Sequence, residues 1–101
     1  MRLDVKKQKF YYILGVMCGE TLFTTFEYDN FDELLNEMKS ILKKYWHDMY
    51  LCTFVVQAFS DNSYDYKNAF FMQEEFDVCS LKIETLEERL IEAINRNYKE
   101  N

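Results

Sequence analysis

Few residues in this chain have the types and spacing that catalysis or metal binding requires. His47 is the only histidine, and there is no P-loop and no GxGxxG motif. A triad or dyad around His47 would need a nucleophile and an orienting partner that no spacing supplies. Cys18, Cys52 and Cys79 show no CxxC pattern, and with one histidine they do not make a usual zinc site. We therefore expect no catalytic residue, no metal, no cofactor and no enzyme activity.

The stretch from Asp61 to Asp77 has the residue types for binding a protein. Five carboxylates stand against Lys67, and tyrosines and phenylalanines lie between them. Rings supply contact area, and carboxylates steer a basic partner to the surface. We interpret these residues as the partner-binding surface: Asp61, Tyr64, Asp65, Tyr66, Glu74, Glu75 and Asp77. The alternative is an edge strand whose acids only prevent edge-to-edge aggregation.

The overall charge favours a basic protein partner over nucleic acid. The net charge is −6, although residues 1–9 carry four basic side chains against one acid. Phosphate binding needs clustered Lys and Arg, which an acidic body lacks. Eight Tyr, nine Phe and one Trp exceed what a core of this size needs, so some rings should be exposed for contact.

Cysteine usage and hydropathy predict a cytoplasmic protein. The odd cysteine count and the polar N-terminus favour a reducing, intracellular setting, and each cysteine lies in or beside an apolar run. Buried, inert thiols are therefore the expectation. No apolar run approaches the length of a membrane span, so we expect no membrane contact. A homodimer remains an open alternative.

One helix is the surest of the elements that must position these residues. From Phe31 to His47, apolar residues recur in steps of three and four, which places them on one stripe of a helix. Asn30 is a favourable N-cap, and Glu33 completes the spacing of a capping box. The broad apolar stripe of this helix requires a sheet to pack against.

The flanking segments predict that sheet. Strands over Lys9–Met17 and Thr21–Tyr28 form one hairpin, and a third strand runs over Met49–Phe59. Alternation resumes at Tyr64 and places four residues on one face: Tyr64, Tyr66, Phe70 and Met72. Whether residues 73–83 form one strand or two is left open. Thr85 is expected to cap a final helix.

These elements predict one α+β domain over residues 1–101, with frayed ends at 1–8 and 98–101. The expected fold is a four- to five-stranded antiparallel sheet with two helices packed on one face, in the order ββαββα. Neither proline nor a Gly-rich linker indicates a second domain.

The function most consistent with these features is that of a small intracellular protein that binds and inhibits a partner. In size, charge and lack of a catalytic set, the chain is similar to the acidic inhibitors of phages and mobile elements, such as anti-CRISPR and anti-restriction proteins. Such a protein would mimic nucleic acid with an anionic surface. The alternatives are a toxin-immunity protein, a small ligand-binding domain or enzyme, and a homodimeric structural module.

Overall fold

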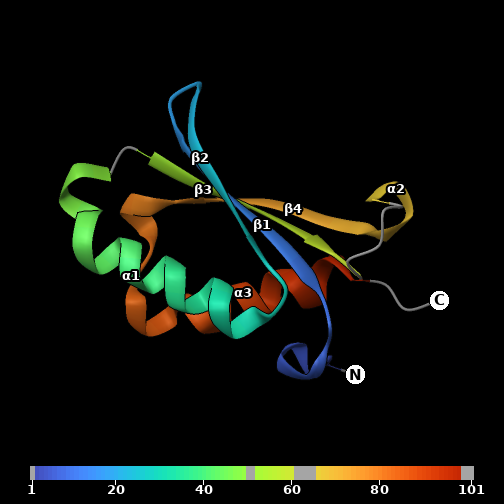
Figure 1. Cartoon of the computed structure of the whole chain (residues 1–101). Coiled ribbons are helices and arrows are strands. Elements are labelled where there is room, and N and C mark those ends of the chain that lie inside the picture. The colour runs from blue at the N-terminus through green and yellow to red at the C-terminus, as the bar shows by residue number, and fades with distance from the viewer. Residues whose placement is uncertain (1, 50–51, 61–65, 99–101) are drawn as a thin grey trace.

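The computed structural model describes residues 2–49, 52–60 and 66–98, without the side chains of residues 23, 46, 48, 49, 66 and 67 (Figure 1). Four antiparallel strands form one sheet in the order β2-β1-β3-β4. They are β1 (Tyr11–Cys18), β2 (Thr21–Tyr28), β3 (Cys52–Phe59) and β4 (Phe70–Asp77). The predicted α+β class and the antiparallel sheet are confirmed.

Two long helices, α1 (Phe31–Met49) and α3 (Ile83–Asn97), lie on the same side of the twisted sheet (Figure 1). The predicted N-cap of α1 is confirmed, because the backbone N–H of Glu33 donates to Oδ1 of Asn30 at 2.8 Å. The helix extends two residues beyond His47, so Met49 ends α1 and does not begin β3. The order ββαββα of the long elements follows the prediction.

The main core lies between the sheet and the two helices. Every second residue of the central strands points into it, and these side chains are fully buried: Tyr12, Leu14, Phe54 and Val56. They meet the apolar stripes of α1 and α3, where Leu34, Met38, Leu86 and Leu90 are equally buried. Burial of this kind stabilises the fold by roughly 1.5–3 kcal/mol for each large side chain.

The first described residues, expected to fray, pack against α3. A 3-10 turn, η1 (Val5–Lys7), places Val5 in the core at 2% exposure. The backbone N–H of Leu3 donates to Oδ1 of Asn95 at 2.6 Å, and Lys6 pairs with Glu87 at 2.6 Å. At the other end of the chain, residues 99–101 lie outside the described part.

Two of the three cysteines are paired, which corrects the expectation of buried, inert thiols. Cys18 of β1 stands directly opposite Cys52 of β3, with their Cα atoms 4.3 Å apart, and the two form a disulfide. Cys79 is a free thiol and is exposed. The pairing depends on the register of two strands that are 34 residues apart in sequence, which spacing alone does not reveal.

The second hairpin differs from its prediction in two ways. A short helix, α2 (Tyr66–Ala69), occupies positions where a strand was expected, so β4 begins only at Phe70. Phe70 pairs with Phe59 and Met72 pairs with Ala58, which leaves Phe71 as an extra residue in β4. The resulting bulge puts Phe70 and Met72 on opposite faces, so their predicted shared face is wrong.

Residues 73–83 contain the last part of one strand, β4, and no second strand, which answers the question that the sequence left open. β4 continues without a bend to Asp77, and a 3-10 turn, η2 (Val78–Ser80), leads to α3. This last helix begins two residues before Thr85, so Lys82 and not Thr85 is its N-cap. The hydroxyl of Thr85 donates to the backbone oxygen of Lys82 at 3.4 Å.

Candidate functional site

The candidate site is the sheet face opposite α1 and α3, which we call the open face. Its centre consists of twelve positions in three rows that cross the strands in the order β2-β1-β3-β4. The rows are Leu22–Met17–Thr53–Asp77, Thr25–Gly15–Val55–Glu75 and Glu27–Ile13–Gln57–Gln73. These positions alternate with the buried ones because successive side chains of a strand point to opposite faces.

The middle of the open face is apolar. Ile13, Met17 and Val55 are half-buried, and Leu22 leaves 53% of its surface exposed. Leu22 lies over Gly15, where a Cβ atom would be 3.5 Å from the Cδ1 of Leu22. Exposed apolar groups that cluster on one face are typical of a contact surface, whereas single scattered ones need no explanation.

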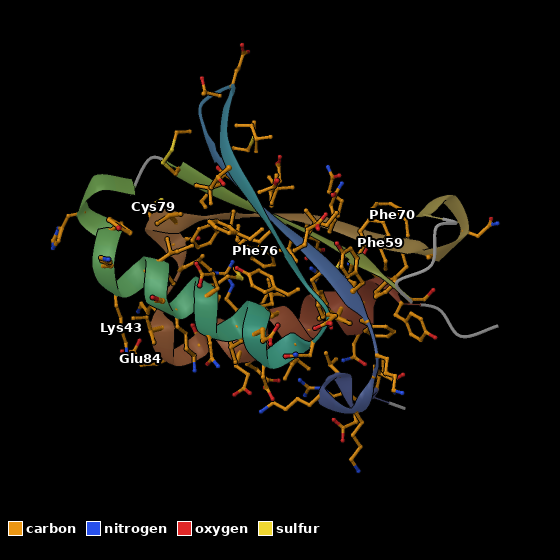
Figure 2. The ribbon with its side chains drawn as sticks, in the orientation of Figure 1. Lys43, Phe59, Phe70, Phe76, Cys79 and Glu84 are labelled. Atoms are coloured by element: carbon orange, nitrogen blue, oxygen red, sulfur yellow. A yellow bond between two sulfur atoms is a disulfide. The ribbon has the colours of Figure 1, made fainter. Side chains whose placement is uncertain are left out.

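An aromatic group continues the open face towards α2. Tyr11 and Phe59 have ring centroids 5.9 Å apart, and Phe59 and Phe70 follow at 5.6 Å. Figure 2 shows Phe59 and Phe70 side by side at this end of the sheet. Tyr11 and Phe59 are buried together with Ala69, while Phe70 remains 43% exposed. Phe70 therefore offers a ring that is held in place by its neighbours but open to a partner.

Carboxylates mark both margins of the open face. The four strands contain four acids and no Lys, Arg or His. Glu27 stands on β2, and Glu75 and Asp77 stand on β4, all three exposed. Asp77 accepts a hydrogen bond from the Oγ1 of Thr53 at 3.3 Å, which orients its carboxylate. The face thus has an apolar middle between two anionic edges.

Glu74, a predicted partner-binding residue, lies on the opposite face of β4 from Glu75 and Asp77. Its carboxylate accepts three hydrogen bonds from Arg96 of α3, from Nη2 to Oε1 at 2.5 Å and to Oε2 at 2.6 Å, and from Nε to Oε1 at 3.2 Å. The hydrogen bond to Glu74 raises the pKa of the Arg96 guanidinium. Asn97 adds a further bond at 3.2 Å. Glu74 therefore connects β4 to α3.

Of the seven predicted residues, the structure places two together on the open face, Glu75 and Asp77. Asp61, Tyr64 and Asp65 lie outside the described residues, and Tyr66 begins α2 without a described side chain. The prediction did not include Leu22, Glu27 or the central positions of β1 and β3. It was confined to the second hairpin, whereas all four strands form the open face.

A charge signal for this part of the molecule is present in the sequence. Between Gly19 and Met38 there are six acids and no Lys, Arg or His, and the rest of the chain has twelve acids and twelve Lys and Arg. The whole net charge of −6 therefore arises from β2, the turns beside it and the start of α1. A sliding window of charge would have found this segment.

Neither family models nor searches of curated proteins and of solved structures gave a significant match. The function must therefore be argued from the geometry of the chain itself.

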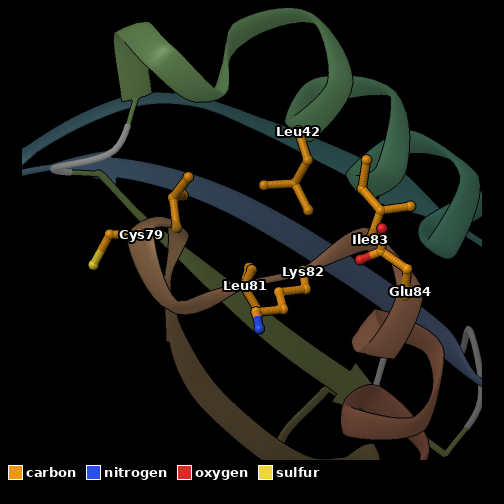
Figure 3. Close-up of a pocket in the computed structure, with 7 residues that line it drawn as sticks. Leu42, Cys79, Leu81, Lys82, Ile83 and Glu84 are labelled. Atoms are coloured by element: carbon orange, nitrogen blue, oxygen red, sulfur yellow. The ribbon is translucent and has the colours of Figure 1, made fainter.

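A pocket at the other side of the molecule is a weaker candidate for a site. It has a volume of about 230 Å³ and lies between α1, η2 and the start of α3, with Leu42 and Ile83 in its wall. Small-molecule sites usually measure roughly 300–1,000 Å³. The sulfur of Cys79 points away from Leu42 and Ile83 (Figure 3). Such a pocket resembles an ordinary packing gap between helices more than a ligand site.

The described part of the chain offers no other chemical centre. Within residues 2–49, 52–60 and 66–98, no group of His, Cys, Asp and Glu side chains could hold a metal ion. No charged or polar residue of that part is buried. None of its helices is long and apolar enough to cross a membrane.

Proposed function

We propose that this chain is a small inhibitory protein that binds a basic partner protein on its open face. The observation that carries the proposal is the composition of that face: half-buried apolar side chains on the central strands, exposed Leu22 and Phe70 on the outer strands, carboxylates at both margins, and no Lys, Arg or His in any of the four strands. An interface needs an apolar centre for affinity and charged margins for steering and selection.

The expected partner surface is the complement of this pattern. It presents an apolar or aromatic centre against Leu22, Val55 and Phe70, and Lys or Arg side chains against Glu27 and Glu75. Cationic grooves that handle nucleic acid have such margins. We therefore propose that the inhibited partner is a nucleic-acid-handling protein, as in anti-CRISPR or anti-restriction systems. In this proposal the chain acts in the cytoplasm and occupies the groove by mimicking nucleic acid.

Charge reversal on one margin tests the proposal. The tagged chain captures its partner from lysate of the cells in which it is naturally made, and the affinity of the purified pair is measured by calorimetry. The double variant Glu75→Lys and Asp77→Lys should bind at least about tenfold more weakly, because like charges then meet across the interface. The matched control, Glu84→Lys and Glu92→Lys, makes the same change of charge on α3, where both side chains are exposed.

Two results would contradict the proposed function. One is equal affinity of the two charge-reversed variants, which would mean that the open face is not used. The other is a captured partner without a basic surface, or one whose nucleic-acid binding is unchanged by saturating amounts of the chain.

A further inference from the structure

The edge strand β2 (Thr21–Tyr28) lacks most of the features that block strand addition. Among the strands of the described residues, β2 has a neighbour only on the side of β1. It is eight residues long and contains no lysine and no proline, and its only charged side chain is Glu27. Such an edge presents unpaired backbone N–H and C=O groups to any extended segment that arrives.

The other edge, β4 (Phe70–Asp77), is much better protected. It carries Glu74, Glu75 and Asp77 within four positions. Arg96 of α3 is hydrogen-bonded to Glu74, and the bulge at Phe71 interrupts the ladder. Charges, bulges and a covering helix are the usual means of protecting an edge. β2 also has a bulge, at Phe23, where its register with β1 shifts. The two edges therefore differ in charge and in the contact with Arg96, and this difference indicates that β2 is the edge left open for pairing.

The charge around β2 decides which kind of segment would fit. The interval from Gly19 to Met38, which contains β2, has six acids and no base. Burial raises the pKa of the Tyr28 phenol to about 12, and the nearby carboxylates of Glu37 and Glu33 on α1 contribute to this rise. A second copy of the chain would bring two such acidic segments together, and like charges at a strand pair are destabilising.

The open face alone is smaller than the area that a stable interface usually takes from each partner. Three interstrand spacings make it about 14 Å wide, so its projected area is only a few hundred Å². A stable interface usually takes about 800 Å² from each partner. A partner that also used the edge of β2 would add contact area without leaving the open face, because Leu22, Thr25 and Glu27 belong to both surfaces.

From these observations we infer that β2 accepts an extended segment of the partner as a fifth strand, in which Lys or Arg alternates with apolar or β-branched residues. This inference rests on the proposed basic partner. Backbone hydrogen bonds of the added strand would supply affinity, and its alternating side chains would supply selectivity. One row of side chains would meet Leu22 and Glu27 on the open face, and the other would meet Tyr28 and the acids of α1.

The test uses a synthetic peptide, the acetylated and amidated sequence KVKTKVKT, added to the isotope-labelled full chain. Amide chemical shifts and hydrogen exchange are followed by nuclear magnetic resonance. At about 1 mM peptide, shifts and slowed exchange should be concentrated in β2, with those of β4 unchanged. The peptide KVKPKVKT, in which proline removes one N–H donor, should bind several-fold more weakly, and EVETEVET should not bind.

A pair of variants locates the contact. Thr25→Lys places a cation on exposed β2 and should weaken peptide binding several-fold. Thr85→Lys makes the same change at an exposed position of α3, outside the open face, and should leave peptide binding unaltered. Three results would overturn the inference: no response up to about 1 mM peptide, a response confined to β4 or the helices, or slowed exchange in β2 that depends on chain concentration alone. The proposed function would fail separately, through the partner affinity of its charge-reversed variants at Glu75 and Asp77.

Discussion

Tyr12 is the one described buried side chain with a polar atom that lacks a hydrogen-bond partner. It is fully buried against Phe31, at a ring-centroid distance of 6.3 Å, so its hydroxyl has lost water without gaining a replacement. An unsatisfied buried polar group costs about 1–3 kcal/mol. We therefore predict that Tyr12→Phe leaves the free energy of unfolding unchanged or raises it by up to about 1 kcal/mol.

Urea unfolding followed by circular dichroism measures this effect. Tyr12→Ala serves as the control for packing and should lose about 3–5 kcal/mol, because it leaves a cavity in the core. A loss of more than about 1 kcal/mol in Tyr12→Phe would show that the hydroxyl has a stabilising role that the structure does not reveal.

The same tyrosine makes the fold sensitive to alkali. Burial raises the pKa of Tyr12, and burial together with Glu37 and Glu33 raises that of Tyr28 to about 12. An unfolded tyrosine titrates near pH 10, so both states keep the proton below that pH and the stability is fully present. Above about pH 10 the unfolded state releases its protons first, and the free energy of unfolding falls as the pH rises towards 12.

Urea titrations between about pH 8 and pH 12 should show this decline in the wild-type chain. The double variant Tyr12→Phe and Tyr28→Phe should show a shallower decline, because the two shifted groups are gone. An identical slope in the variant would assign the alkaline instability to other groups.

Two neighbouring acids are predicted to have separate roles. Glu74 is hydrogen-bonded to Arg96 on the helix side, while Glu75 is exposed on the open face. We expect Glu74→Gln to lower the thermal midpoint and leave partner binding intact. Glu75→Gln should leave the midpoint unchanged and weaken binding. Thermal unfolding and calorimetry on the same samples check both halves, and an exchange of the two phenotypes would refute the assignment of faces.

At the scale of elements, the disulfide joins the two central strands of the sheet. Closing a loop between residues 34 apart stabilises a fold by at most roughly 4 kcal/mol through the entropy of the unfolded chain. The double variant Cys18→Ser and Cys52→Ser should lose a part of this amount under oxidising conditions. Under reducing conditions it should match the wild type to within about 1 kcal/mol.

The redox state of the cellular compartment decides whether Cys18 and Cys52 are present as thiols or as a disulfide. In the proposed cytoplasmic setting, thiols are kept reduced, so Cys18 and Cys52 should be recovered as thiols from cells lysed in an alkylating agent. Recovery of the disulfide by mass spectrometry would contradict the cytoplasmic location. Equal stability of the wild type and the serine variant in oxidising buffer would contradict the stabilising role of the bond.

Sequence patterns that act over a few residues predicted most elements of this fold. Features that depend on contacts between distant segments were not predicted. The bounds of β2 and the start of α1 at Phe31 are correct, because alternation and capping by Asn30 act over a few residues. The helix α2 and the bulge at Phe71 interrupt the alternation of the second hairpin, so its faces were mispredicted. Strand register is equally non-local, and it decides the disulfide.

The candidate site was predicted in part for the same reason. Glu75 and Asp77 lie on one exposed face, as a shared surface requires, whereas Glu74 lies on the other face because successive side chains of a strand point to opposite faces. The contributions of β2 and β3 could not be predicted from one hairpin, since only the order β2-β1-β3-β4 brings them together.

At the scale of the whole molecule, the structure has a layer of helices and a layer formed by the sheet. The helices and the inner sheet face supply the core, and the cationic side chains lie outside the four strands. The net negative charge arises from the segment 19–38, so the excess of acids lies in β2, the turns beside it and the start of α1, while the acids and bases of the remaining sequence are equal in number. This asymmetry should orient an approaching basic partner and make its association rate fall with ionic strength.

The most direct test of the account is the footprint of the captured partner on the isotope-labelled chain. Amide shifts and hydrogen exchange are compared between the free and the saturated chain. We predict that the changes concentrate in β1, β2 and β3 and at Glu75 and Asp77, with the exposed sides of α1 and α3 unchanged. A footprint on the outer surfaces of α1 and α3, with the open face unaltered, would contradict the claim that this chain binds through its sheet.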